Sequence, residues 1–306
     1  MMTEFRGVIP PVVVAEHEDG TFDAESYQRG LDRMIHAGVH GVFALGSSGE
    51  GAFATPSRRE EILRATNEVV AGRVPVLAGV IDTQTDRVIE HVKQAEKIGV
   101  DGIVATAPFY ALGGMPQVER HFRQVGAATD LPLFAYDIPV CVHVKLPPAL
   151  LMRLGEDGVI TGVKDSSGDD VSFRFLLQDN ERAGHPLSLL TGHEVVVDGA
   201  YLGGADGSVP GLANVDPAGY VRQWNAYQAG DWETVRKEQD RLSDLMRIVM
   251  VPSSTTGFGA GVGAFKTALK VLGVFESNKM PEPVSVLLPE EEEGIAQVLR
   301  HVGLMD

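Results

Sequence analysis

The sequence predicts an α/β protein built as a (β/α)8 barrel with a C-terminal helical extension. Short apolar runs alternate with amphipathic helical patterns at roughly 30-residue spacing, which is typical of βαβ units. Eight such runs favour a closed TIM barrel, although an open, doubly wound sheet remains possible because strand order cannot be read from sequence. The length of 306 residues also fits a barrel of about 250 residues followed by an extension.

The expected strands are rich in Val, Ile, Leu, Ala and Gly and do not alternate with polar residues. This is the pattern of strands that are buried on both faces. The runs are residues 7–14, 41–47, 74–80, 102–109, 132–139, 160–166, 187–193 and 205–211. The last run is the weakest prediction, because it contains Pro210 and glycines.

Helical patterns lie between these runs. In residues 57–71 the side chains of Ile62, Ala65 and Val69 share one face, and Ser57 with Glu60 predicts a capping box. Further helices are expected at 84–98, 116–128, 147–154, 170–183 and 194–203.

The pattern changes after the eighth strand, because four helices are expected and no strand follows. These helices are residues 216–229, 231–250, 260–273 and 290–303. We therefore divide the chain into residues 1–215, with the barrel strands and most helices, and residues 216–306, with the last barrel helix and the extension. The four acids that follow Pro289 suit a helix start, where they meet the helix dipole.

Composition excludes several functions. The chain carries 26 Lys and Arg against 42 Asp and Glu, a formal charge of -16, and no basic patch, so it is not expected to bind nucleic acid. A single cysteine, Cys141, excludes an intrachain disulfide and a multi-cysteine metal site. No apolar run approaches 18 residues, and the first residues lack the layout of a signal peptide. We expect a soluble, cytoplasmic protein that does not enter a membrane.

Lys164 is the strongest candidate for a catalytic residue, because the active sites of such barrels lie at the carboxyl ends of the strands. It follows an apolar strand, and a lysine in an apolar pocket is pushed toward the neutral, nucleophilic amine. Its natural target is a ketone or aldehyde, giving a Schiff base. The alternative is an ordinary strand-end lysine paired with Asp165 or Asp169. Three other lysines, Lys145, Lys266 and Lys270, are expected at the surface.

Two other strand ends carry candidates. Tyr136 could relay a proton, or it could be a core tyrosine whose hydroxyl bonds a carbonyl. The turn at 46–50 (GSSGE) offers backbone N–H groups and the hydroxyls of Ser47 and Ser48, which suit a carboxylate. The alternative is a plain turn between a strand and a helix.

Other motifs are weaker. His193-Glu194 lacks the second histidine of a zinc-binding HExxH motif. The alternating glycines at 257–263 do not match a dinucleotide-binding fingerprint and indicate a flexible or closely packed turn. Cys141 could be reactive or a small buried hydrophobe. A metal-dependent barrel lyase using His193 and Glu194, and a binding protein without activity, remain alternatives, but we expect neither a metal nor an organic cofactor.

Three segments, 46–50, 136–139 and 162–165, stand in order at the strand ends. With these motifs the chain resembles the dihydrodipicolinate synthase and N-acetylneuraminate lyase superfamily of pyruvate-dependent class I aldolases, over nearly its whole length. The resemblance implies a (β/α)8 barrel, usually assembled as a homotetramer, that acts on pyruvate or a pyruvyl-containing 2-oxo acid. It implies Lys164 as the Schiff-base lysine and Tyr136 as the proton shuttle.

By the same resemblance, Ser47 relays protons beside the tyrosine, and Ser47 and Ser48 hold the pyruvyl carboxylate. Tyr110 is implied to reach across a subunit interface into the neighbouring site. Gly192 and Val209 match positions that line the pocket.

The chain also departs from the family pattern. Two serines replace the usual threonine pair, and Asp137 stands where asparagine is usual. Lysine-pathway synthases carry an arginine for the second substrate's carboxylate where this chain has Cys141, and a cysteine cannot form that bidentate pair. We therefore expect a Schiff-base-forming lyase that makes or breaks a C–C or C–O bond next to a pyruvyl unit, on a 2-keto-3-deoxy sugar acid or related 2-oxo acid. Cys141 disfavours the alternative, a true 4-hydroxy-tetrahydrodipicolinate synthase.

Overall fold

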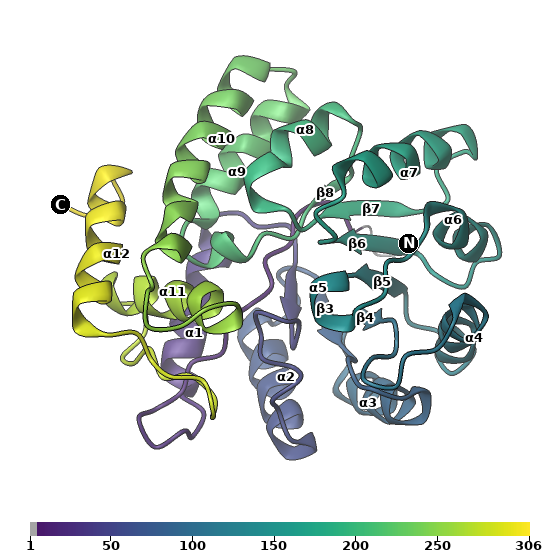
Figure 1. Ribbon diagram of the computed structural model, residues 1–306, viewed down its shortest axis with the longest axis horizontal. Coiled ribbons are helices and arrows are strands. Elements are labelled where there is room, and N and C mark those ends of the chain that lie inside the picture. The colour runs from purple at the N-terminus through teal and green to yellow at the C-terminus, as the bar shows by residue number, and fades with distance from the viewer. Residues whose placement is uncertain (1–4) are drawn as a thin grey trace.

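The computed structural model describes residues 5–306 and contains one sheet of eight parallel strands, curled into a ring that helices surround (Figure 1). The strand order in the sheet is β1-β8-β7-β6-β5-β4-β3-β2. The strands are β1 (Gly7–Val8), β2 (Val42–Ala44), β3 (Val76–Gly79), β4 (Gly102–Thr106), β5 (Leu133–Asp137), β6 (Gly162–Asp165), β7 (Ser188–Thr191) and β8 (Gly207–Ser208).

The ring closes between the segment after β1 and strand β2. Pro11 and Phe43 form a parallel bridge, and the backbone N–H of Val12 donates to the carbonyl of Phe43 at 2.9 Å. All eight predicted runs contain a strand, and closure confirms the barrel over an open sheet. The observed strands are shorter than the runs, most clearly at β1, because the prolines at 10 and 11 have no N–H to donate.

Apolar packing fills the end of the barrel at which the strands begin. The ring of Phe5 meets the ring of Phe134 edge-on, with centroids 5.3 Å apart, and both side chains are buried. A Cβ on Gly162 would lie 2.3 Å from the Phe134 ring, so only glycine fits there. Packed side chains therefore close this end of the barrel.

The helices of the outer ring largely follow the predicted ranges. They are α2 (Pro56–Val70), α3 (Thr85–Ile98), α4 (Met115–Gly126), α6 (Pro148–Glu156), α7 (Asp170–Arg182), α8 (Val197–Leu202) and α9 (Pro217–Gln228). The predicted capping box at Ser57 is wrong: the Thr55 side chain caps α2 by accepting from the N–H of Arg58 at 3.3 Å. Pro56 then occupies the first turn, where its missing N–H costs nothing.

Two helices were not predicted, α1 (Ala24–His36) and the short α5 (Pro139–Val142). The buried face of α1 includes Ser26 and Gly30 as well as Leu31 and Met34, so its apolar stripe is too interrupted to stand out in the sequence. Its start is fixed by Asp23, whose side chain accepts from the N–H of Ser26 at 2.9 Å.

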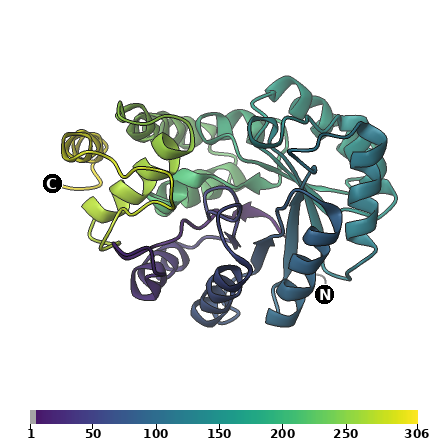
Figure 2. The same cartoon turned by 60° about the horizontal axis from the view of Figure 1, so that its bottom comes forward.

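The C-terminal helical extension is confirmed. Helix α10 (Trp232–Met246) packs against α9, and α11 (Phe258–Val271) and α12 (Pro289–His301) lie beyond the barrel helices (Figures 1 and 2). The acids after Pro289 form the first turn of α12, as predicted. The alternating glycines differ from the prediction: Gly257 precedes α11, and Gly259, Gly261 and Gly263 lie within that helix. Among the described residues, no helix has the length and apolar character needed to span a membrane.

Candidate active site

Six of the seven predicted site residues surround one cavity of about 420 Å³ at the carboxyl ends of the strands. They are Ser47, Ser48, Tyr136, Lys164, Gly192 and Val209. The seventh, Tyr110, lies outside it after β4, with 93% of its side chain exposed. The structure therefore brings the predicted lysine, tyrosine and serines together within one chain and leaves Tyr110 apart.

The strand register places Tyr136 and Lys164 side by side. They are partners across β5 and β6, and Asp137 and Asp165 are the next pair. Because successive side chains of a strand point to opposite faces, the first pair faces the cavity and the second faces the helices. The Lys164 Nζ lies 4.1 Å from the centre of the Tyr136 ring and 5.0 Å from that of Phe43.

Lys164 is held without a carboxylate partner. Its side chain is 5% exposed, and it forms no ion pair with any residue in the described range 5–306. The alternative partners are occupied elsewhere: Asp165 accepts from the N–H of Ser167 at 2.9 Å, and Asp169 caps α7 by accepting from Ser172. The ion-paired alternative for Lys164 is therefore wrong. Gly192 leaves room for this side chain, since a Cβ there would lie 3.1 Å from the Lys164 Cε.

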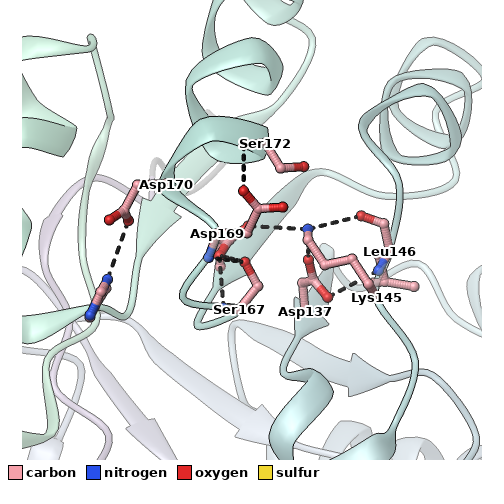
Figure 3. A network of polar contacts seen from close by, with 9 residues as sticks. Asp137, Lys145, Leu146, Ser167, Asp169, Asp170 and Ser172 are labelled. Atoms are coloured by element: carbon pink, nitrogen blue, oxygen red, sulfur yellow. Dashed lines mark hydrogen bonds and ion pairs between the residues drawn. The ribbon is translucent and has the colours of Figure 1, made fainter.

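A polar network stands behind these two residues, on the helix side of the sheet. Lys145 points at Asp137 and donates to its Oδ2, while the N–H of Leu146 donates to Oδ1 at 3.0 Å (Figure 3). Lys145 also lies 3.8 Å from Asp165. Lys145 is thus half-buried in an ion pair, and its predicted place at the surface is wrong.

The same network accounts for the aspartate at position 137. Its carboxyl group is fully buried, and burial raises its pKa to about 6, against the lowering effect of the hydrogen bonds from Lys145 and Leu146. Burial also raises the pKa of Asp165, opposed by the hydrogen bonds from Ser167. A carboxylate at 137 can pair with the lysine at 145, which an amide cannot do, and the pair fixes the segment that follows β5.

The turn after β2 carries the two serines. Ser47 Oγ lies 3.4 Å from the hydroxyl of Tyr136, within reach of proton exchange. Gly49 and Gly51 are required by close backbone approach, since a Cβ would lie 2.8 Å from the carbonyl of Val12 and 2.2 Å from that of Leu45, respectively. The turn is therefore tightly packed and holds the hydroxyls of Ser47 and Ser48 at the cavity wall.

Glu50 and Lys266 anchor this turn to the C-terminal extension. The Lys266 Nζ lies 2.5 Å from Glu50 Oε1 and donates to the carbonyl of Lys279 at 2.8 Å. Lys266 is fully buried and Glu50 is 4% exposed, so the predicted surface position of Lys266 is wrong. Burial raises the pKa of Glu50 to about 7, and the Lys266 ammonium opposes that shift. The buried neighbours of Lys266 in α11, Phe265 and Ala268 among them, were the available signal.

Glu194, which the sequence suggested only as a ligand in the metal-dependent alternative, also lines the cavity. Its Oε1 accepts from the N–H of Gly211 at 3.0 Å. Burial raises the pKa of Glu194, and the positive charge of Lys164 is among the effects that oppose the shift. His193 also lines the cavity, and its Nδ1 lies 3.2 Å from Asp170.

The structure does not support the metal-dependent alternative: within the described range, no cluster of metal-ligating side chains lies at this cavity. Among the described residues, the side chains that could share one ion are His17, Asp23 and Glu276, none of which lines the cavity. His193 and Glu194 do not belong to such a group.

Cys141 fits neither of its two predicted roles well. It is exposed rather than a buried hydrophobe. Burial of the sulfur nevertheless raises the pKa of the thiol, and Lys164 and the Ser47 hydroxyl only oppose that shift. Because the thiolate is the reactive form, the raised pKa disfavours a reactive cysteine.

The fold and the site define a barrel enzyme with a lysine-centred cavity, and comparisons with known proteins place it further. The model of the dihydrodipicolinate synthetase family matches residues 4–302. An uncharacterized DapA-like lyase from Halobacterium salinarum is 35% identical, over 98% of this chain and 95% of that one. A 4-hydroxy-tetrahydrodipicolinate synthase from Phenylobacterium zucineum is 30% identical, over 98% of each chain.

Solved structures agree with this placement. The E. coli prophage protein YagE, of the dihydrodipicolinic acid synthase family and solved in complex with pyruvate, superposes with a TM-score of 0.93 at 28% identity, over 98% of this chain and 99% of that one. Dihydrodipicolinate synthase from Bacteroides thetaiotaomicron gives 0.91 at 30% identity, over 98% and 100%. The chain belongs to the dihydrodipicolinate synthetase family, and it is a DapA-like class I lyase.

Proposed function

We propose that this protein is a Schiff-base-forming lyase that makes or breaks a bond next to a pyruvyl unit. The observation that carries the proposal is Lys164, buried at 5% exposure without an ion-pair partner in the described range, beside Tyr136 in a cavity of about 420 Å³. An amine so placed is a nucleophile for the ketone of a 2-oxo acid once it has given up a proton.

The proposed reaction balances without an external cofactor. The Lys164 amine adds to the ketone, and the carbinolamine loses water to give an iminium ion. Loss of a proton from the adjacent methyl carbon gives an enamine, and this carbon forms a bond with the carbonyl carbon of an aldehyde, whose oxygen takes up a proton. Water then hydrolyses the iminium ion and frees the lysine. The reverse sequence cleaves a C–C bond. In a dehydratase, the iminium ion of a hydroxylated 2-oxo acid loses a proton from the adjacent carbon to give the enamine, which expels the hydroxyl group of the next carbon as water after that group takes up a proton.

Tyr136 and Ser47 are proposed to move the protons. The two hydroxyls lie 3.4 Å apart, and the tyrosine ring lies beside the Lys164 amine. The hydroxyls of Ser47 and Ser48 are proposed to hold the pyruvyl carboxylate, with Gly192 and Val209 shaping the cavity wall.

Tyr136→Phe is expected to lower kcat by about 10²- to 10⁴-fold, which is the range for losing a positioned proton carrier. KM for the 2-oxo acid should change far less, because the ring itself stays in place. Steady-state kinetics at saturating substrate measure the split. Activity within a few-fold of the wild type would remove Tyr136 from the proposed mechanism.

The assembly and the aldehyde partner belong to the proposal as well. Tyr110 is proposed to act on the site of a neighbouring subunit in a homotetramer, which its 93% exposure supports. The cytoplasmic location stays a prediction.

Cys141 disfavours a true 4-hydroxy-tetrahydrodipicolinate synthase, although relatives carry that name. Among other 2-oxo acids the sequence favours a 2-keto-3-deoxy sugar acid.

Borohydride trapping tests the proposal. Incubation with pyruvate and sodium borohydride is expected to add one reduced pyruvyl group per chain, located at Lys164 by peptide mapping. Borohydride without pyruvate is the blank, and Lys270→Ala, a half-exposed lysine of α11, is the matched variant that should still be labelled. Failure to label Lys164 with pyruvate and with a panel of larger 2-oxo acids would overturn the assignment.

A further inference from the structure

A histidine and two carboxylates from distant parts of the sequence meet outside the lysine cavity. They are His17, in the loop that follows β1, Asp23, at the start of α1, and Glu276, in the connector of residues 275–279 that follows α11. One potential ligand atom of each lies within 4.8 Å of the other two, and none of the three side chains lines the lysine cavity. The cluster is therefore separate from the proposed reaction.

A buried oxygen of Asp23 indicates that this cluster has a ligand. The Asp23 side chain is 2% exposed, and its Oδ1 caps α1 by accepting from the N–H of Ser26 at 2.9 Å. Its Oδ2 is buried and has no hydrogen-bond partner within the described part of the chain. The Nδ1 of His17 faces this oxygen at 3.9 Å, which is too long for a hydrogen bond. Because a buried carboxylate oxygen without a partner is costly, it is a ready ligand for a cation.

The charges around Asp23 keep its carboxyl group ionised. Burial raises the pKa of Asp23, but the hydrogen bonds from Ser26 and the nearby charges of His17 and Arg29 outweigh that effect and hold the pKa below its usual value. The Arg29 guanidinium stands beside the cluster without filling it, since it donates to Ser26 Oγ at 2.8 Å and lies 3.7 Å from Glu276 Oε1. An ionised carboxylate is the form that binds a metal ion.

The loop that carries His17 is held in a fixed shape. The N–H of His17 donates to the carbonyl of Thr21 at 2.9 Å, and the N–H of Asp23 donates to the carbonyl of Ala15 at 3.0 Å. These bonds fix the backbone at two of the three ligands, so little conformational freedom is lost when an ion binds.

The connector is held against the same loop. The N–H of Glu276 donates to Ser26 Oγ at 3.2 Å, and the hydroxyl of Ser277 donates to Glu18 at 2.7 Å. The loop before α1 and the connector accordingly lie side by side in both views of the fold (Figures 1 and 2). The third ligand is therefore brought to the other two by contacts that do not involve an ion.

One imidazole and two carboxylates form a donor set for Zn²⁺, with water in the fourth position. A point at the centre of the three ligand atoms lies about 2.8 Å or less from each, and zinc bonds to such atoms are about 2.0–2.2 Å long. The side chains of His17 and Glu276 are 50% and 64% exposed, so they are free to move inward by the difference. Mg²⁺ and Ca²⁺ fit less well, because they prefer oxygen ligands alone.

We propose that His17, Asp23 and Glu276 bind one Zn²⁺ ion, which fastens the connector to the loop before α1. The connector ends at Lys279, whose carbonyl accepts from the Lys266 ammonium at 2.8 Å. The ion therefore stabilises the segment that holds this buried lysine. It takes no part in the reaction at Lys164, and the inference does not depend on the Schiff-base function.

Calorimetric titration with zinc chloride tests the site. Full-length protein is stripped with EDTA, dialysed free of it and titrated with ZnCl₂, and saturable binding of one ion per chain is expected. MgCl₂ at the same concentrations should give no saturable heat, because imidazole is a poor ligand for magnesium. Absence of saturable zinc binding would refute the proposal and leave the cluster as an ion pair of histidine and aspartate.

Three conservative variants remove one ligand each. Asp23→Asn keeps an oxygen to cap α1, and His17→Gln and Glu276→Gln alter exposed side chains, so all three should fold. Each is expected to weaken zinc binding by more than about tenfold, since even residues that only support a metal ligand are worth about 10–100-fold in affinity. Circular dichroism confirms that the variants are folded.

Two variants on α1 serve as matched controls. Glu25→Gln removes a negative charge from the first turn of the same helix, and His36→Gln removes an exposed histidine from its last turn. Both should bind zinc within about twofold of the wild type, since neither residue belongs to the cluster. Equal weakening in the controls and in the ligand variants would mean that zinc is attracted by general surface charge, and the proposed site would be wrong.

Hydrogen–deuterium exchange locates the bound ion and tests the fastening of the connector. Zinc is expected to slow exchange in peptides that cover residues 15–23 and 275–279 together, and this protection should be lost in Asp23→Asn. Protection at residues 193–194 instead would place the ion at the lysine cavity and overturn the proposal. Binding that protects only one of the two segments would show that the ion does not join them.

Discussion

Lys164→Ala is expected to lower turnover of the pyruvyl substrate by more than about 10³-fold, because a covalent catalyst cannot be replaced by binding alone. Borohydride labelling and deuterium exchange into pyruvate should disappear with it. No other lysine lines the cavity among the described residues, so no neighbouring amine can take over. Coupled assays for pyruvate release, run beside the labelling experiment, measure both effects.

The variant should stay folded, which makes the loss interpretable. Lys164 forms no ion pair in the described part of the chain, so its removal leaves no carboxylate unpaired. Circular dichroism and the oligomeric state should match the wild type.

Chemical rescue distinguishes a lost nucleophile from a lost shape. Lys164→Cys followed by alkylation with 2-bromoethylamine restores an amine at nearly the original length, although Cys141 would be alkylated as well. The Cys141→Ser background removes that ambiguity. Recovery of part of the activity and of borohydride labelling is expected. Turnover near the wild-type level in Lys164→Ala would refute the Schiff-base assignment outright.

The sequence was sufficient for the barrel because buried parallel strands have a local signature. Runs such as 102–109 and 132–139 are apolar without alternation, and each contains a strand of the barrel. Helix α1 was not predicted, because its buried face includes Ser26 and Gly30, whose burial depends on what packs over them. The start of α2 was misplaced because Thr55 and Ser57 both offer a hydroxyl, and the hydrogen bond that selects Thr55 is a matter of geometry.

The candidate site could be predicted only for residues that stand at the carboxyl ends of the predicted strands. Tyr136 and Lys164 follow from register between neighbouring strands. The apolar cavity lined by Phe53, Phe109 and Phe258 does not, since these rings meet only after the barrel has closed and α11 has packed on it. Lys266 was misassigned for a related reason: its partner Glu50 is more than 200 residues away, and only its apolar neighbours in the sequence indicate burial.

Lys266→Met is expected to destabilise the protein by about 3–5 kcal/mol at pH 8, the cost of breaking a buried ion pair and leaving one charge behind. Glu50 is 4% exposed, and in this variant its buried carboxylate loses its ion-pair partner. Urea unfolding, monitored at fixed protein concentration, measures the loss. Lys270→Met is the control on the same helix: its pair with Glu292 is half-exposed, so about 1 kcal/mol or less is expected.

The pH dependence of this loss identifies Glu50 as its source. Burial raises the pKa of Glu50 from 4.5 to about 7. Protonation of Glu50 therefore stabilises the folded state, and this contribution is fully present below pH 4.5 and is lost as the pH rises through 7. Without the Lys266 ammonium the pKa rises further, and at pH 5 the folded variant can keep Glu50 neutral. The destabilisation should therefore be smaller at pH 5 than at pH 8, while the lost hydrogen bond to Lys279 contributes equally at both.

The double variant Glu50→Gln, Lys266→Met completes the cycle. With no carboxylate left to desolvate, it should recover most of the pH-dependent loss, giving a coupling of the two sites above about 1 kcal/mol. Equal destabilisation at pH 5 and pH 8, or no recovery in the double variant, would show that Lys266 acts by packing alone. Because Glu50 lies two residues after Ser48, a positive result would mean that the C-terminal extension holds the serine turn of the cavity in place through one buried ion pair.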